Sequence, residues 1–228
     1  MSIFRDRREA GRQLAQRLLR YKDRPNTIVL ALPRGGVPVG FEVAQALHLP
    51  LDVLLIRKLG LPHQEELAMG AIAEGDVRFL NEDVVRYWDI PQAIIDRVTK
   101  KETAELQRRA QLYRQGRPLA GLRGKTVILV DDGIATGAGM RAALRALAQQ
   151  HPKGVVVAVP TAPKDFGEFF LDMADETVQV QPLQQGGVGA AYEDFSQTTD
   201  EEVIRLLEEA QAPMAMAAED ERRVLYGY

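Results

Sequence analysis

The sequence lacks cysteine altogether and contains only three histidines and one tryptophan in 228 residues. Without cysteine, no disulfide framework can support the fold. No apolar run approaches the length of about twenty residues that a membrane-spanning helix requires, so a membrane protein is not expected. The net charge is −3, with no excess of basic residues. This balance argues against nonspecific binding of nucleic acid, which depends on a basic surface.

A secretion signal is not expected either, because the first residues continue into a charged helical pattern rather than an apolar core. We therefore expect a cytoplasmic protein. The hydrophobic and charged fractions, 46% and 27%, are ordinary for a globular protein. A chain of this length can build one sizeable core. We expect a single domain over residues 1–212 and a flexible tail in the alanine-rich, charged residues 213–228.

Short apolar runs alternate with helical patterns through most of the chain. Strands are expected at residues 27–32, 51–56, 67–73, 77–80, 127–130, 154–159 and 177–180. Helices are expected at residues 5–21, 37–47, 91–115 and 203–210, and the arginines of the first are expected on its solvated face. The apolar runs are typical of strands covered on both faces, so the alternation predicts an α/β fold with a doubly wound, mainly parallel sheet. A helical insert is expected over residues 82–120, packed either across the site or across the interface of a homodimer.

The stretch at residues 127–139 joins a buried strand, two carboxylates and a loop of small residues. Asp131 and Asp132 follow the strand at its carboxyl end, where open α/β sheets bind their ligands. The loop leads into a helix, so its backbone N–H groups and the helix N-terminus can hold a phosphate. Two adjacent acids beside an anion site suit sugar hydroxyls or a cation, and a sugar phosphate would use the whole stretch. The alternative is an ordinary strand-turn-helix unit with surface aspartates; neither GxxxxGK[ST] nor GxGxxG occurs in the chain.

This stretch resembles the PRPP (phosphoribosyl diphosphate) signature of the type I phosphoribosyltransferases, in which four apolar residues, two acids and a Thr-Gly loop follow one another. The resemblance implies that Asp131 and Asp132 bind the ribose hydroxyls and reach Mg²⁺ through the ribose or water. It also implies a 5′-phosphate site formed by Ala135, Thr136, Gly137, Ala138 and Gly139. Gly139 stands where the family commonly has Thr or Ser. Because neighbouring carboxylates repel each other, asparagine at either aspartate is expected to keep the stability intact and to weaken PRPP binding.

A second small-residue loop, with the sequence Pro-Arg-Gly-Gly, follows the strand at residues 27–32. It is expected at the same sheet edge as the aspartates. In the resembled family this position holds the pyrophosphate loop, often with a non-proline cis peptide, which would be Pro33–Arg34 here. The resemblance implies pyrophosphate binding by Arg34, Gly35 and Gly36. Considered alone, the loop is equally typical of a simple turn.

Residues 57–66 have the composition of an exposed polar loop that begins with an Arg-Lys pair. This is similar to the mobile loop of the adenine and xanthine phosphoribosyltransferases. Its closure would bring cations to the leaving group and exclude water. The resemblance implies a catalytic role for Arg57 and Lys58, and the alternative is a solvated hairpin tip.

Two further segments bear on the acceptor. Lys164 follows the strand at residues 154–159, where hypoxanthine-guanine enzymes place a lysine that contacts the base. Residues 182–198 loosely resemble the hood of the purine enzymes, in which an aromatic ring stacks on the base and an acid helps to hold the metal. The resemblance implies Tyr192 as the acceptor-binding aromatic residue and Asp194 as the acid near the metal.

We therefore predict transfer of a phosphoribosyl group from PRPP to a nitrogen nucleophile, a nucleobase, with Mg²⁺ and with release of pyrophosphate. No covalent enzyme nucleophile is required, so the protein contributes placement and charge stabilisation. The alternative is a regulatory protein of the same fold that senses PRPP or a nucleotide and performs no transfer. A purely structural α/β domain would leave the paired aspartates unexplained. The expected partners are PRPP and an unidentified nitrogenous acceptor, without nucleic acid or membrane.

Overall fold

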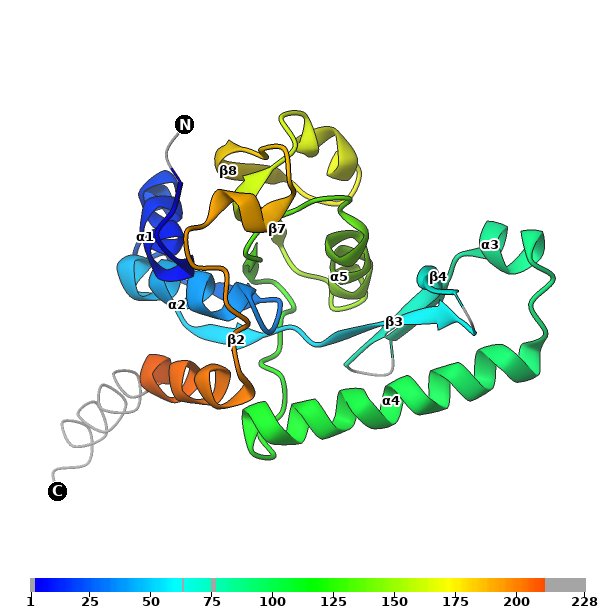
Figure 1. Ribbon diagram of the computed structural model, residues 1–228. Coiled ribbons are helices and arrows are strands. Elements are labelled where there is room, and N and C mark those ends of the chain that lie inside the picture. Colours follow the sequence, from blue (N-terminus) through cyan, green and yellow to red (C-terminus); the bar gives the residue numbers. More distant parts are fainter. Residues whose placement is uncertain (1–2, 63, 75–76, 212–228) are drawn as a thin grey trace, which may run out of the picture.

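The computed structural model describes residues 3–62, 64–74 and 77–211 (Figure 1). The expected tail at residues 213–228 lies outside the described residues. Within the described part of the chain, no helix is both long and apolar enough to cross a membrane.

The core of the fold is a five-stranded parallel sheet with the strand order β2-β1-β6-β7-β8. Its strands are β1 (Thr27–Ala31), β2 (Leu51–Val53), β6 (Thr126–Val130), β7 (Gly154–Ala162) and β8 (Glu176–Pro182). β1 and β6 are neighbours, with Ala31 beside Val130. The two strands therefore end side by side, and the segments that follow them leave the same edge of the sheet. The predicted mainly parallel α/β sheet is confirmed.

Helices cover both faces of this sheet (Figure 1). Val29 and Ile128 pack in one buried cluster, and the next residues along each strand, Leu30 and Leu129, pack in the other. Because both faces are buried, β1, β6 and most of β7 read as continuous apolar runs, whereas the edge strand β8 is mostly half-buried and alternates apolar with polar residues. A helix over residues 200–211 joins the first cluster. Of the other α-helices of the core, α1 (Arg7–Arg17) and α2 (Gly36–Leu47) pack in the first cluster and α5 (Ala138–Ala148) packs in the second. The short 3-10 helices are η1 (Leu19–Tyr21), η2 (Phe166–Phe170) and η3 (Val188–Ala191).

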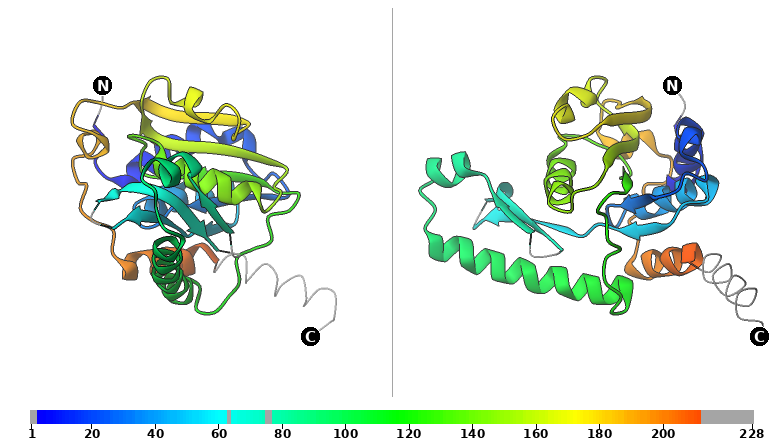
Figure 2. Two further views of the ribbon diagram at one scale, coloured as in Figure 1. Left: turned by 90° about the vertical axis from the view of Figure 1, so that its right-hand side faces the viewer. Right: turned by 180° about the vertical axis from the view of Figure 1, so that it is seen from behind.

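An arm projects from the core between β2 and β6 in the chain (Figures 1 and 2). It contains an antiparallel sheet with the order β3-β4-β5, followed by two helices. The helix expected at residues 91–115 is confirmed, whereas the short helix before it was not indicated by the sequence pattern. The elements of the arm are β3 (Ile56–Leu61), β4 (Gln64–Ala73), β5 (Val77–Leu80), α3 (Glu82–Tyr87) and α4 (Gln92–Arg114).

The expectation of an exposed loop over residues 57–66 is wrong, because residues 57–61 lie in β3 and residues 64–66 lie in β4, and these two strands pair as a β-hairpin. Leu59 and Leu61 are buried in it, whereas Lys58 is exposed. Such alternation belongs to a strand with one buried face. The adjacent Arg-Lys pair and Gly60 concealed it, because charged residues and glycine are typical of loops.

Arg114 fixes the end of α4 to the core. The residue is 2% exposed, and its Nε donates a hydrogen bond of 2.8 Å to Oδ1 of Asp52. Its Nη groups donate to the carboxylate of Glu74 and to the carbonyl oxygen of Val53. Asp52 and Val53 lie in β2, and Glu74 directly follows β4. One buried cation therefore ties the two ends of the arm to the central sheet.

Candidate active site

The segments that follow β1 and β6 meet at the carboxyl edge of the sheet. The peptide bond Pro33–Arg34 is cis, as the resemblance implied. A Cβ atom on Gly35 would lie 2.0 Å from Oδ2 of Asp132, and one on Gly36 would lie 2.9 Å from the carbonyl oxygen of Val130. Only glycine allows the two segments to approach this closely. The Pro-Arg-Gly-Gly loop and the aspartates are therefore neighbours.

Asp131 lies at the base of a cleft between the core and the arm. Its Oδ1 accepts a hydrogen bond of 2.9 Å from the backbone N–H of Asp132. The residue keeps some exposed surface, while protein atoms surround the carboxyl group. Burial and, after it, the charge of Asp132 raise the pKa of Asp131 well above its ordinary value of 3.8. Asp131 is one of the residues that line the cleft, and no cationic side chain of the described residues forms an ion pair with its carboxyl group.

Asp132 has a different environment, because Arg7 of α1 holds it. Nε of Arg7 lies 2.8 Å from Oδ2 of Asp132, and the two side chains are 11% and 17% exposed. Arg7 also donates a hydrogen bond of 2.7 Å to the carbonyl oxygen of Ser196 and lies 4.0 Å from the ring centroid of Phe195. Burial raises the pKa of Asp132, and the hydrogen bond from Arg7 opposes that rise. Arg7 thus links the second aspartate to the segment at residues 182–198.

Arg7 and Phe195 are site residues that the sequence analysis missed. The expectation that the arginines of the first helix lie on a solvated face is wrong for Arg7. Its partner Asp132 is 125 residues away, and helical periodicity contains no information about a partner on another element. Phe195 is 38% exposed and lies only three residues beyond Tyr192. A search for the exposed aromatic residue of the hood could have considered both rings.

The cleft has a volume of about 1250 Å³ and is bordered by the predicted phosphate loop on one side and by the arm on the other. A smaller pocket of about 440 Å³ shares Pro33 and Arg109 with it. The cleft is lined from the core by Asp131, Thr136, Ala138 and Gly139, and from the arm by the cations Arg57, Lys58, Arg97, Lys101, Arg108 and Arg109. The smaller pocket is lined by Arg7, Arg34, Gly35, Asp132 and Phe195, among others.

The loop before α5 enters the helix through a glycine in the left-handed region, without a side-chain cap among the described residues. Gly137 precedes the helix with φ of 75°, and a Cβ atom there would lie 3.2 Å from the ring of Phe170. Thr136, Ala138 and Gly139 are exposed and line the cleft, and Ala135 beside them is exposed as well. The N–H group of Ala138 donates a hydrogen bond of 3.5 Å to Oγ1 of Thr136, and the N–H groups of the first helical turn have no partner within the helix. A Cβ atom on Gly139 would meet no other atom within 4 Å. The position that commonly carries Thr or Ser in the resembled family therefore has room for either side chain.

Arg57 is held by α4. Its Nη2 and Nε lie 2.6 Å and 2.7 Å from Oε2 of Glu102, which is 8% exposed. Lys58 is exposed on the same strand and also lines the cleft. Both cations reach the predicted site, and they do so from a paired strand rather than from a mobile loop.

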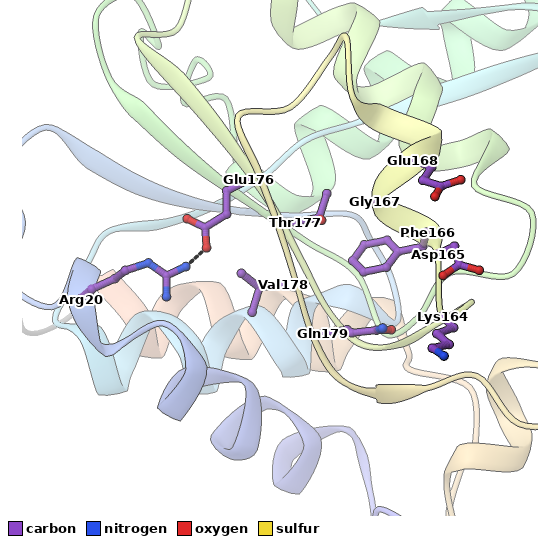
Figure 3. A pocket seen from close by; sticks show the side chains of 10 residues that line it. All are labelled: Arg20, Lys164, Asp165, Phe166, Gly167, Glu168, Glu176, Thr177, Val178 and Gln179. Atoms are coloured by element: carbon purple, nitrogen blue, oxygen red, sulfur yellow. Dashed lines mark ion pairs between the residues drawn. The ribbon is translucent and has the colours of Figure 1, made fainter.

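Lys164 does not reach this cleft. It lines a separate pocket of about 500 Å³ beside β8, where Arg20 forms an ion pair with Glu176 (Figure 3). Figure 3 shows the lysine at the opposite end of that pocket from the ion pair. After β7 the chain turns into η2, which contacts β8, the edge strand on that side of the sheet. The position of Lys164 does not fit the implied contact with an acceptor.

Tyr192 and Asp194 also differ from their implied roles. Tyr192 is 6% exposed, packs between Phe4 and Phe195, and donates its hydroxyl hydrogen to the backbone oxygen of Asp132. The ring therefore packs between two other aromatic rings and has no free face for a base. Asp194 is exposed outside both pockets, and its carboxylate accepts a hydrogen bond of 2.9 Å from the N–H of Ser196. Its position does not fit a metal ligand at this site.

The donor set constrains how a metal could bind. Among the residues that the structure describes, no group of three or more His, Cys, Asp or Glu side chains could hold an ion. Four carboxylates line the cleft and the smaller pocket, and three of them are paired, Asp132 with Arg7 and both Glu102 and Glu105 with arginines of the arm. Mg²⁺ commonly keeps several waters and binds through one or two carboxylates and the phosphates of a substrate. The residues fit an Mg²⁺ ion that enters with a phosphorylated ligand and is approached by Asp131.

A family model described as "Phosphoribosyl transferase domain" matches residues 4–180. The chain belongs to the phosphoribosyl transferase family. It is 49% identical over 218 residues to a protein of two Mycobacterium tuberculosis strains that is named "Putative phosphoribosyl transferase". The match covers 95% of this chain and 49% of the relative, so the chain spans about half the length of the curated relatives it matches. A crystal structure from Thermus thermophilus is 44% identical, with a TM-score of 0.78 over 92% of this chain and 99% of that chain.

The range that matches the phosphoribosyl transferase family includes both aspartates, both small-residue loops and the whole arm. Phe195 and Ser196, the contacts of Arg7 in the last segment, lie beyond it. The family relationship therefore applies to the cleft itself. The segment that contacts Arg7 beside Asp132 belongs to a part of the chain that the family model does not match.

Proposed function

We propose that this phosphoribosyl transferase moves a phosphoribosyl group from PRPP to a nitrogen nucleophile, with a nucleobase as the acceptor class, and releases pyrophosphate. One observation carries the proposal. Asp131 and the exposed loop before α5 line the same cleft, so a carboxylate for ribose hydroxyls and an anion site for a 5′-phosphate face one ligand. Mycobacterial relatives named as phosphoribosyl transferases support the same reaction class.

The charge of the cleft supports a polyanionic ligand. Among the described residues, eight cationic side chains and four carboxylates line the cleft and the smaller pocket. The whole chain has the opposite balance, with a net charge of −3. Concentrating cations at one site raises the local concentration of an anionic substrate and speeds its association. PRPP, with a 5′-phosphate and a diphosphate, matches this distribution.

In the proposed reaction, the bond between C1 of the ribose and a pyrophosphate oxygen breaks, and its electron pair leaves with pyrophosphate. A bond forms between C1 and the acceptor nitrogen, whose proton passes to water or to the released pyrophosphate. Positive charge builds on the ribose and negative charge on the leaving group during this exchange. Asp131 would hold the ribose hydroxyls, and the N–H groups before α5 would fix the 5′-phosphate.

The leaving group would lie along the Pro-Arg-Gly-Gly loop, with Arg34 and the backbone of Gly35 and Gly36 beside it. Arg57 and Lys58 would complete the positive surroundings from β3. An Mg²⁺ ion bound with PRPP would supply further neutralisation of the diphosphate charge, approached by Asp131. No side chain needs to form a covalent bond to the sugar.

A second candidate function is PRPP or nucleotide sensing without transfer. It is favoured by one observation, namely that the expected mobile lid is a paired strand whose Arg57 is engaged with Glu102. A sensor requires a site for the ligand but no closing step. A transferase with this arm would instead have to exclude water by moving the arm or by using the ligand itself.

A screen of nucleobases with PRPP and Mg²⁺, measuring pyrophosphate release, tests the two functions. The parent is compared with Asp131→Asn and, as a matched control, with Asp172→Asn, an exposed aspartate away from the cleft. Release that depends on one base and is lost only in Asp131→Asn is the result we expect. PRPP binding without release for any base would favour the sensor. Absence of PRPP binding by the parent would overturn both functions.

A further inference from the structure

We infer that Arg109 of α4 binds the diphosphate of PRPP, a contact that the family signature does not contain. The inference rests on the proposed function and names an additional binding residue for it. The resemblance implies Arg34 beside the pyrophosphate, with Arg57 and Lys58 as the cations that approach it from the other side. The geometry assigns a central part of that task to α4 instead.

Arg109 occupies the junction of the two pockets. Asp131 lines the larger cleft, and Arg34 with Gly35 lines the smaller pocket. Arg109 and Pro33 line both. A ligand whose ribose binds Asp131 and whose diphosphate lies along Arg34 and Gly35 would therefore extend across the junction that Arg109 lines.

Glu105 holds this guanidinium in position. Oε1 of Glu105 accepts a hydrogen bond of 2.8 Å from Nε of Arg109, and both carboxylate oxygens accept hydrogen bonds from Arg108. The hydrogen bonds from Arg108 first, and those from Arg109 next, lower the pKa of Glu105 to about 2, so the carboxylate stays ionised at neutral pH. Within the described residues, no hydrogen bond engages the Nη groups of Arg109, whose side chain is 28% exposed. A planar guanidinium with free Nη groups can form a bidentate contact with phosphate.

Two other cations near the proposed diphosphate path have guanidinium groups that carboxylates already engage. Arg57 is engaged with Glu102 through Nε and Nη2, and Arg7 is engaged with Asp132. Lys58 lines the larger cleft but not the smaller pocket. Arg109 is also placed rigidly, because the buried Arg114 anchors the same helix to the core five residues later, little more than one helical turn away.

The test compares Arg109→Gln with the parent and with Lys100→Gln, a matched control on the same helix that is exposed and lines neither pocket. Calorimetric titration with pyrophosphate, ribose 5-phosphate and PRPP, each with Mg²⁺, separates the two ends of the ligand. For Arg109→Gln we expect pyrophosphate and PRPP to bind at least about tenfold more weakly, as for loss of a charge-assisted contact. Ribose 5-phosphate should bind within about twofold of the parent, because its phosphate lies at the other end of the cleft. Arg109→Lys, which keeps the charge and loses the fork, should fall between the two.

Two results would overturn the inference while leaving the proposed function intact. Parental affinity of Arg109→Gln for pyrophosphate would show that the residue does not touch the diphosphate. Equal weakening of ribose 5-phosphate and pyrophosphate would assign the residue to the structure of the arm, and a lowered melting temperature of this variant would accompany it. A parent that binds none of the three ligands would instead remove the proposed function, so the two failures are distinguishable.

Discussion

Asp131 and Asp132 are adjacent in the sequence but have opposite electrostatic situations. Asp131 is crowded by protein and by the charge of its neighbour, and no cationic side chain in the described residues contacts its carboxylate. Asp132 is paired with Arg7, which also contacts Ser196 and Phe195. The expectation that asparagine is tolerated at both positions is therefore restricted to Asp131. Asp131 is the residue proposed to bind the ligand, and Asp132 supports the last segment through Arg7.

Asp132→Asn is expected to destabilise the protein. The substitution leaves Arg7 without its carboxylate in a largely buried place, and breaking a buried ion pair costs about 3–5 kcal/mol. The remaining contacts of Arg7 favour the lower end of that range. Urea denaturation measures the loss, with Asp172→Asn as the exposed control. If Arg7→Gln and the double variant show no coupling with Asp132→Asn, the ion pair does not stabilise the fold.

Asp131→Asn is expected to melt above the parent at neutral pH, by an amount that depends on pH. Burial and the charge of Asp132 raise the pKa of Asp131 in the folded protein above its ordinary value of 3.8. Between these two values the folded state binds more protons than the unfolded state, so the stability of the parent falls as the pH rises through that window. The advantage of Asp131→Asn should therefore be largest above the folded pKa and vanish as the pH falls towards 3.8. Melting curves of both proteins across this pH range would contradict the assignment if the difference were constant.

At the scale of elements, the position of the arm depends on one buried cluster. Arg114 contacts Asp52, Glu74 and Val53, and thereby joins α4, β2 and the end of β4. The cations on the arm can face Asp131 only while this base is fixed. Stability of the fold and placement of the site are therefore coupled at Arg114.

Arg114→Met is expected to be strongly destabilising. It leaves two buried carboxylates without their cation, at a cost of about 3–5 kcal/mol. The control is Arg205→Met, which removes an exposed pair with Glu209 and should cost at most about 0.5 kcal/mol. Thermal and urea denaturation measure both variants. Similar small losses for the two substitutions would mean that Arg114 does not anchor the arm.

The elements of the core were predictable, and those of the arm only partly. Val127 to Val130 reads as a strand because both faces are covered, and the same holds for β1 and most of β7. In β3 the exposed Lys58 and the half-buried Gly60 alternate with the buried Leu59 and Leu61, and the charged residue and the glycine are typical of loops. The helix α3 spans six residues without a buried side chain, which leaves no apolar periodicity to detect.

At the scale of the whole molecule, the two small-residue loops could be placed together from the sequence because parallel strands end at one edge. The charged contacts of the site could not be predicted in this way. Arg7 with Asp132 and Arg57 with Glu102 are separated by 125 and 45 residues, and each pair joins different elements. Such partners depend on how the arm and the first helix pack against the sheet. The cationic cleft on a chain with a net charge of −3 is likewise a product of that packing.

The most direct test of the account is calorimetric titration of PRPP with Mg²⁺ into the parent protein and into Asp131→Asn. We expect the parent to bind PRPP and the variant to bind it at least about tenfold more weakly, because hydrogen bonds to a charged group contribute about 1.5–3 kcal/mol each. Circular dichroism of the variant, with a melting temperature at or above that of the parent, would show that the loss belongs to the site. Equal affinity of the two proteins for PRPP, or no binding to the parent at millimolar PRPP, would contradict the account.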